Sequence, residues 1–166
     1  YDTPEVRRFL TTLGERRFPV VLADRYLDGV ELDSVVSLNE DIGYRLTRPL
    51  IEAGHRRIAY AGYKENVSSI VERYKGYQRA LRDADLAGGR PPEGSAADRT
   101  LVLNLERVHD EPERVVKETM SLRNRPTAFV CTNDLYVSKV YAELLKLGYR
   151  APDDIEFAAV DDEHPV

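Results

Sequence analysis

Residues 50–62 read Leu-Ile-Glu-Ala-Gly-His-Arg-Arg-Ile-Ala-Tyr-Ala-Gly and join the end of a predicted helix to a predicted strand. Apolar residues recur at helical spacing up to Leu50, and Gly54 is a typical residue to end a helix. The strand that follows, residues 57–62, is almost continuously apolar and does not alternate. Strands of this kind are covered on both faces, so the stretch favours a parallel sheet between two layers of helices.

The same alternation of helix and strand continues in both directions along the chain. Five apolar runs are predicted strands: residues 19–24, 57–62, 100–105, 126–133 and 155–161. A shorter alternating run, residues 34–38, is a candidate crossing strand. Because helical patterns separate these runs, the predicted fold class is α/β, a doubly wound parallel sheet.

Capping residues mark where the predicted helices begin and end. Thr3-Pro4-Glu5 is a helix start, and Gly14 is expected to end that helix. Pro49 is expected to kink the helix that ends at Gly54. Residues 87–97 have the composition of a loop and are expected to form a surface connection. The later helices are expected to begin at Ser69, at Asp110 with Pro112, and at Asp134.

Composition limits the class of protein. The 166 residues are 42% apolar and 32% charged, which is ordinary for one globular domain. No apolar run approaches the roughly 20 residues needed to cross a bilayer.

The net charge of -5 disfavours contact of this chain with a phosphate backbone. Because the chain starts at Tyr1 and not at Met, we expect that the natural N-terminus lies upstream. The single Cys131 is expected to be buried and suits a reducing compartment.

Polar side chains follow four of the predicted strands. Ligands of an open parallel sheet bind beyond the carboxyl ends of its strands, where Asp24, Tyr63, Asn133 and Asp161 stand. Arg73 joins them, because it lies one turn into a helix that begins at the same edge and about 60° from the apolar stripe of that helix. Carboxylates, an amide and a guanidinium offer the paired donors and acceptors that hydroxyl-rich ligands need.

Each of these residues also has an ordinary structural interpretation. A single Asp after a strand more often caps a helix, which is what we expect of Asp134 and Asp162. Arg73 alone would more often be a partly buried ion-pair partner. Gathered at one edge, the set favours a binding site in which Arg73 clamps the ligand and adds little to stability. Tyr63 is the weakest member of the set.

Signatures of other chemistries are missing from the sequence. It contains no Gly-x-Gly-x-x-Gly, no Gly-x-x-x-x-Gly-Lys-Ser/Thr and no Gly-x-Ser-x-Gly. His55, His109 and His164 are scattered without the spacing of metal ligands. We therefore expect no catalytic residue, no metal and no cofactor.

Four segments, in this order, resemble those of the lac/gal repressor family. They are residues 50–62, residues 72–81 (Glu-Arg-Tyr-Lys-Gly-Tyr-Gln-Arg-Ala-Leu), residues 126–134 (Pro-Thr-Ala-Phe-Val-Cys-Thr-Asn-Asp) and residues 147–155 with 160–162. The resemblance covers nearly the whole chain and implies a two-lobed effector domain of the periplasmic-binding-protein-like type. Residues 1–38 would end the N-terminal lobe, residues 39–162 would form most of the C-terminal lobe, and residues 163–166 would begin the return crossover.

The resemblance also implies a function. A sugar or related metabolite would lie between the lobes, in contact with Asp24 on the first lobe and with Arg73, Asn133 and Asp161 on the second. The whole protein would be a cytoplasmic transcription repressor without catalytic activity, and operator DNA would be bound by a domain outside this chain. A homodimer is implied through the helix after Asn133 and the chain around Asp162. Tyr136 lies off the inward stripe of that helix and is expected to contact the second subunit.

The chain departs from the family pattern at three places. Leu38-Asn39 keeps only the Asn of an Asp-Asn pair, and Ala159-Val160 stands where the family often has Gly and an aromatic residue. Residues 106–110 offer no aromatic side chain to lie over a sugar. The identity of the effector therefore stays open.

Two alternatives belong to other functional classes. One is an extracytoplasmic sugar-binding protein of the same fold that serves a transporter. The other is a doubly wound enzyme that uses Asp24 or Asp161 as a general base. The enzyme is disfavoured because no nucleophile, metal set or phosphate loop accompanies these carboxylates.

Overall fold

A four-stranded parallel sheet organises most of the chain. The structure is a computed structural model that describes residues 2–87 and 101–162. The strands lie in the order β4-β3-β5-β6, and every neighbouring pair is parallel. Their bounds are β3 Ile58–Tyr63, β4 Leu101–Asn104, β5 Ala128–Cys131 and β6 Glu156–Ala159. The parallel sheet that residues 50–62 predict is therefore confirmed.

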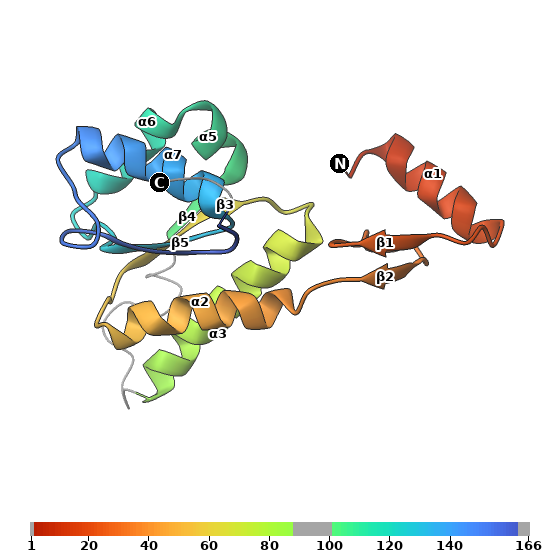
Figure 1. The fold of residues 1–166 in the computed structure, drawn as a ribbon, viewed down its shortest axis with the longest axis horizontal. Coiled ribbons are helices and arrows are strands. Elements are labelled where there is room, and N and C mark those ends of the chain that lie inside the picture. The colour runs from red at the N-terminus through yellow and green to blue at the C-terminus, as the bar shows by residue number, and fades with distance from the viewer. Residues whose placement is uncertain (1, 88–100, 163–166) are drawn as a thin grey trace.

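Helices cover both faces of this sheet (Figure 1). On one face lie α2 (Asn39–Glu52) and α3 (Ser68–Ala87), and on the other lie α5 (Leu105–Asp110), α6 (Pro112–Met120) and α7 (Asp134–Lys146). Successive residues of each buried strand point to opposite faces, so β3 supplies Tyr60 to the α2–α3 side and Ala61 to the α7 side. The doubly wound α/β class is confirmed.

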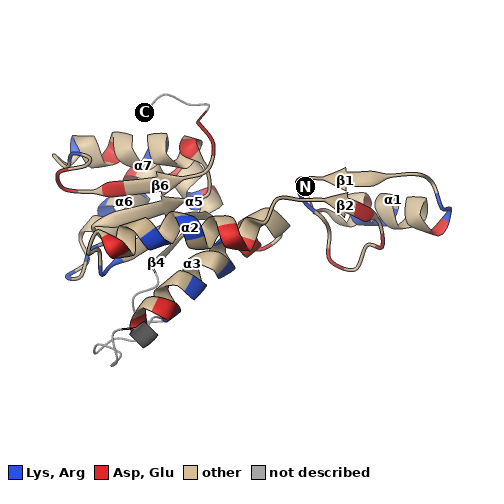
Figure 2. Ribbon diagram, turned by 60° about the horizontal axis from the view of Figure 1, so that its bottom comes forward, with Lys and Arg blue, Asp and Glu red and all other residues tan. Residues whose placement is uncertain are grey.

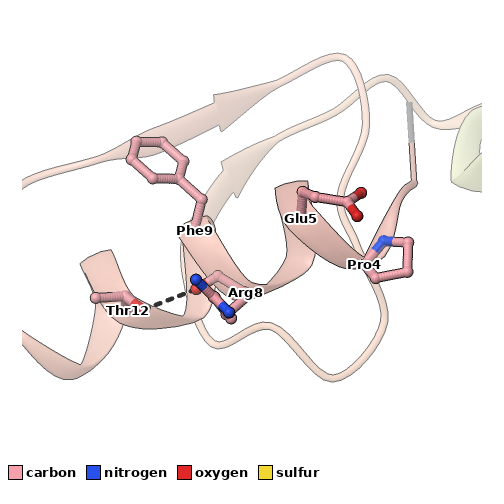
Figure 3. Close-up of a pocket in the computed structure, with 5 residues that line it drawn as sticks. All are labelled: Pro4, Glu5, Arg8, Phe9 and Thr12. Atoms are coloured by element: carbon pink, nitrogen blue, oxygen red, sulfur yellow. Dashed lines mark hydrogen bonds between the residues drawn. The ribbon is translucent and has the colours of Figure 1, made fainter.

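A smaller unit precedes the sheet. It consists of α1 (Pro4–Glu15) and a separate parallel pair of strands, β1 (Val21–Ala23) and β2 (Asp33–Val35). In the part of the chain that the structure describes, large apolar side chains of this unit are left uncovered, since Phe9 is 62% and Val35 69% exposed. Five side chains of α1 line a hollow of about 400 Å³: Pro4, Glu5, Arg8, Phe9 and Thr12. Figure 3 shows how these side chains lie on the helix.

Several helix boundaries differ from the predictions. The short helix α5 was not predicted, because six residues show too little periodicity; Asn104 caps it by accepting hydrogen bonds from the amides of Glu106 and Arg107. Asp110 therefore ends α5 and does not begin the next helix, which starts at Pro112. The predicted cap Asp134 is the first residue of α7, and Asn133 caps that helix.

The start of α1 agrees with the sequence, and its end is close to the prediction. Thr3 caps α1 by accepting from the amide of Val6, and the helix runs one residue past Gly14. α2 continues through Pro49 to Glu52. The predicted loop 87–97 lies outside the described residues, except for Ala87, which is the last residue of α3. The predicted return crossover, residues 163–166, lies outside them as well.

Two further expectations concern single features. Cys131 is confirmed as buried, and burial raises the pKa of its thiol, so the thiol stays protonated at neutral pH. Within residues 2–87 and 101–162, no helix combines the length and the apolar character needed to span a membrane.

Candidate functional site

A pocket of about 360 Å³ lies at the carboxyl end of the sheet, where the small N-terminal unit meets it. The chain leaves β3 toward α3 on one face and leaves β5 toward α7 on the other, so the crevice between these two strands is a topological switch point. Four of the five residues singled out from the sequence line this pocket: Asp24, Arg73, Asn133 and Asp161.

Arg73 is held by two hydrogen bonds inside the protein. Its Nε donates to Oδ1 of Asn39 at 2.9 Å, and its Nη1 donates to the carbonyl of Thr132 at 2.9 Å. Asn39, at the start of α2, is only 1% exposed. A guanidinium has five N–H groups, so this arrangement fixes its plane and leaves the Nη2 amino group to meet a ligand.

Asp24 and Asp161 adopt the same unusual backbone conformation. Their φ angles are 71° and 72°, in the left-handed region that non-glycine residues seldom enter. Each follows a strand of a different sheet, β1 for Asp24 and β6 for Asp161. Both side chains are exposed, and that of Asp24 accepts from its neighbour Arg25 at 3.2 Å. Backbone of this kind concentrates at ligand-binding positions, so the shared conformation adds to the sequence argument for both carboxylates.

Asn133 has a structural task as well as a place in the pocket. Its side-chain oxygen accepts from the amide of Tyr136 at 3.4 Å and so caps α7. The oxygen of the amide is thereby used within the protein. The amide nitrogen is the group that can donate to a ligand.

Tyr63 does not line the pocket. Its ring packs on Tyr74 of α3 with 4.7 Å between ring centroids, beside the cluster on the α2–α3 face. The cause is local: Gly62 has a φ of 97°, and the register of β3 with β4 shifts between Ala61 and Tyr63. Such a bulge re-aims the next side chain. The structure therefore places the ring of Tyr63 on α3 and not among the residues that line the pocket.

The sequence argument missed several residues that line the pocket. Ser69, Lys64 and Thr132 belong to this group. Ser69 could have been found, because it precedes Arg73 by one helical turn and shares its face of α3. Lys64 could not, because its ion pair with Glu106, at 2.9 Å, joins the loop after β3 to the first turn of α5, 42 residues further along the chain.

Tyr136 corrects an expectation about assembly. It is 5% exposed and belongs to the core cluster between the sheet and α7, and it lines the pocket. Burial, and secondarily Asp110, raises the pKa of its phenol. A side chain in this position is covered by its own lobe, so it cannot be the subunit contact inferred from its place off the helical stripe.

We expect Tyr136→Glu to destabilise the fold itself. A carboxylate in that position must lose its hydration or take up a proton, and the ring's packing against the core is lost as well. The loss should be about 3 kcal/mol or more in the free energy of unfolding, measured by urea denaturation. Leu145→Glu on the same helix, where the side chain is 47% exposed, is the control and should change it little. Equal stability of Tyr136→Glu and the parent protein would contradict the burial of this ring.

Within the described ranges, 2–87 and 101–162, no three His, Cys, Asp or Glu side chains come together in a way that could hold an ion. The pocket instead combines exposed carboxylates with a guanidinium and an amide, which match neighbouring hydroxyl groups.

Comparisons with known proteins show the family and the fold of the chain. Residues 47–166 match the family model described as a periplasmic binding protein-like domain. The chain is 28% identical over 159 residues to the HTH-type transcriptional repressor PurR of Vibrio atlanticus, covering 96% of this chain and 44% of that protein. It is 30% identical over 156 residues to the PurR protein of Aliivibrio fischeri strain MJ11, covering 92% and 44%. The chain thus spans less than half the length of these relatives.

A solved structure shows the same architecture. The transcription regulator CcpA of Lactococcus lactis is 25% identical and superposes with a TM-score of 0.70, over 92% of this chain and 52% of that one.

Proposed function

Because this chain belongs to the family of periplasmic binding protein-like domains, we propose that it is the effector-binding part of a transcription repressor of the lac/gal type. The observation that carries the proposal is the convergence of Asp24, Arg73, Asn133 and Asp161 on one pocket between two lobes. In this proposal Asp24 belongs to the N-terminal lobe, which ends with residues 1–38, and Arg73, Asn133 and Asp161 belong to the C-terminal lobe, residues 39–162.

The effector we propose is a hydroxyl-rich small molecule, a sugar or a related metabolite. The carboxylates of Asp24 and Asp161 accept from hydroxyl groups, while Nη2 of Arg73 and the amide nitrogen of Asn133 donate to them. A sugar loses many hydrogen bonds to water on binding, and a site of this kind replaces them in pairs. No catalytic step follows, because the pocket offers hydrogen bonds but no activated nucleophile.

Regulation then follows from the position of the pocket. A ligand held by residues of both lobes favours the arrangement in which those residues face each other. The ligand can shift the equilibrium between two arrangements of the lobes only by the difference between its affinities for them. In the proposed cytoplasmic homodimer this shift alters the affinity for operator DNA, which a helix-turn-helix outside these residues would bind.

Charge supports the assignment of DNA binding to another part of the protein. The net charge is -5, and Figure 2 shows Lys and Arg interspersed with Asp and Glu along α2 and α3. Binding to a phosphate backbone needs a concentration of positive charge. The rival assignment, an extracytoplasmic transport protein, is disfavoured because the relatives named above are transcription repressors.

We expect the 166-residue chain to fold, to bind its effector weakly and to leave DNA unbound. One wall of the pocket is nearly complete here, whereas the other contributes Asp24 and its neighbours. Loss of several charge-assisted hydrogen bonds, each worth about 1.5–3 kcal/mol, raises the Kd by about three orders of magnitude.

A thermal-shift screen of sugars and purines on the full-length repressor would identify the effector. Calorimetry would then compare the Kd of that effector for the full-length repressor and for the 166-residue chain. A gel shift with operator DNA should show a complex only for the full-length protein. Micromolar or tighter binding by the 166 residues would mean that the second lobe holds a complete site. Turnover of any screened compound would contradict the proposal of a binding protein.

A further inference from the structure

The loop after Asp24 crosses from the small N-terminal unit to the helix that carries Arg73. The backbone amide of Tyr26 donates to Oγ of Ser68 at 3.0 Å, and its phenol donates to Oε1 of Glu72 at 2.8 Å. Ser68 is the first residue of α3, and Glu72 lies one turn further along the helix. Tyr26 is half-buried against this turn. Two hydrogen bonds from one residue therefore tie one lobe to the other.

The loop itself is anchored on its own lobe. Arg7 of α1 donates from Nη1 to the carbonyl of Asp28 at 2.6 Å and pairs with Asp2 through its other nitrogens. Contacts therefore join α1 to the loop at Asp28 and the loop to α3 at Tyr26.

The contact with Tyr26 and the ligand pocket use different residues of the same helical turn. Ser68 and Glu72 accept from Tyr26, whereas Ser69 and Arg73 line the pocket. Consecutive helical residues point about 100° apart, so Tyr26 holds α3 from a side that a ligand in the pocket would not occupy. The pKa of the phenol is raised, first by the hydrogen bond to Glu72 and then by burial, so the phenol remains a donor at neutral pH.

We propose that Tyr26 is a positioning residue that latches the N-terminal unit onto α3 and holds the two walls of the pocket together before any ligand arrives. The consequence for effector affinity rests on the proposed function. A pocket that is already closed binds its ligand without the free-energy cost of closing first. Loss of the hydrogen bond from Tyr26 to the carboxylate of Glu72 should therefore raise the Kd of the effector about tenfold.

The distance between the lobes tests the latch without any ligand. Spin labels on Glu15→Cys at the end of α1 and Lys117→Cys on α6 report that distance, and both positions are exposed. The native Cys131 is 1% exposed and does not compete for the label. Tyr26→Phe removes only the phenol oxygen, and we expect it to lengthen and broaden the distance distribution measured by pulsed electron paramagnetic resonance.

Partner variants separate the hydrogen bond from a general loss of structure. Glu72→Ala should reproduce the change, Glu72→Gln should restore the parent distribution because its amide oxygen still accepts, and adding Tyr26→Phe to Glu72→Ala should change nothing more. Tyr149→Phe, distant from the loop on the opposite end of the sheet, is the matched control. An unchanged distribution in Tyr26→Phe, or failure of Glu72→Gln to restore it, would overturn the latch. Because no effector is present, this outcome is independent of the proposed function.

Discussion

Gly76→Ala is expected to leave the chain unable to fold stably. A Cβ on Gly76 would lie 1.9 Å from the carbonyl oxygen of Glu40 and 2.6 Å from the amide nitrogen of Tyr44, both on α2. These are backbone atoms, so no side chain can turn away. α2 and α3 would have to separate along the interface that buries Leu50 and Tyr77. The expected loss is about 4 kcal/mol or more, a large part of the roughly 5–15 kcal/mol that stabilises a domain.

The sign of this effect identifies its cause. In an exposed helix, Ala in place of Gly would stabilise by about 1 kcal/mol. A large loss can therefore come only from the helix crossing. Thermal and urea unfolding followed by circular dichroism would measure it. Arg45→Ala on α2, where the side chain is 80% exposed, is the control and should stay within about 0.5 kcal/mol of the parent. A Gly76→Ala protein with an unchanged melting temperature would show that the two helices do not touch there.

The same crossing positions the ligand pocket. Gly43 of α2 faces the carbonyl of Arg73, and a Cβ on Gly43 would lie 1.9 Å from that oxygen. Asn39, one turn earlier on α2, holds the guanidinium of Arg73. Two glycines thus let the helices approach closely enough for a buried amide to orient the proposed ligand clamp. Stability and ligand recognition share this contact.

Sequence patterns predicted the parts of the fold that depend on local order. Continuous apolar runs such as residues 57–62 identified the buried parallel strands, and the rule that ligands bind at strand ends brought Asp24, Arg73, Asn133 and Asp161 to one place. Both inferences use properties of short segments. The first inference is confirmed because each buried strand of a doubly wound sheet carries the same apolar pattern, whereas the binding role of the four polar residues stays a prediction.

The failures concern features that neighbours in space determine. The side chain of Tyr63 lies outside the pocket because the register of the strand shifts at Gly62. Tyr136 is buried by core residues that are distant in sequence, so its position on the helix did not predict its burial. Gly43 and Gly76 sit inside helices where periodicity gives them no special meaning. Their role depends on a crossing between two helices, which no local pattern encodes.

Arg73→Ala is expected to cost both effector binding and stability. From the sequence, Arg73 was expected to act on the ligand alone. The structure adds hydrogen bonds to Asn39 and to the carbonyl of Thr132, and Asn39 is 1% exposed. Removal of the guanidinium leaves the amide oxygen of Asn39 buried without its donor, which costs about 1–3 kcal/mol in the free energy of unfolding.

Effector affinity should fall further than stability in the full-length protein. A lost charge-assisted pair, together with the carboxylates left without their counterpart, should raise the Kd by about a hundredfold, or roughly 2.7 kcal/mol. Asn39→Ala separates the two roles, because it removes the same internal hydrogen bond but keeps the guanidinium. Asn39→Ala should lower the free energy of unfolding about as much as Arg73→Ala does, and it should lower the affinity for the effector less.

Arg82→Ala completes the series, because Arg82 is exposed on the same helix and should change neither quantity. Calorimetry with the effector found by the thermal-shift screen measures affinity, and urea unfolding measures stability. Unchanged affinity in Arg73→Ala, with the stability loss present, would make this arginine a strut between α2, α3 and β5 and not a ligand clamp. The hydroxyl-binding chemistry proposed for the pocket would then depend on its two carboxylates and Asn133, because these would be the remaining groups able to orient a sugar.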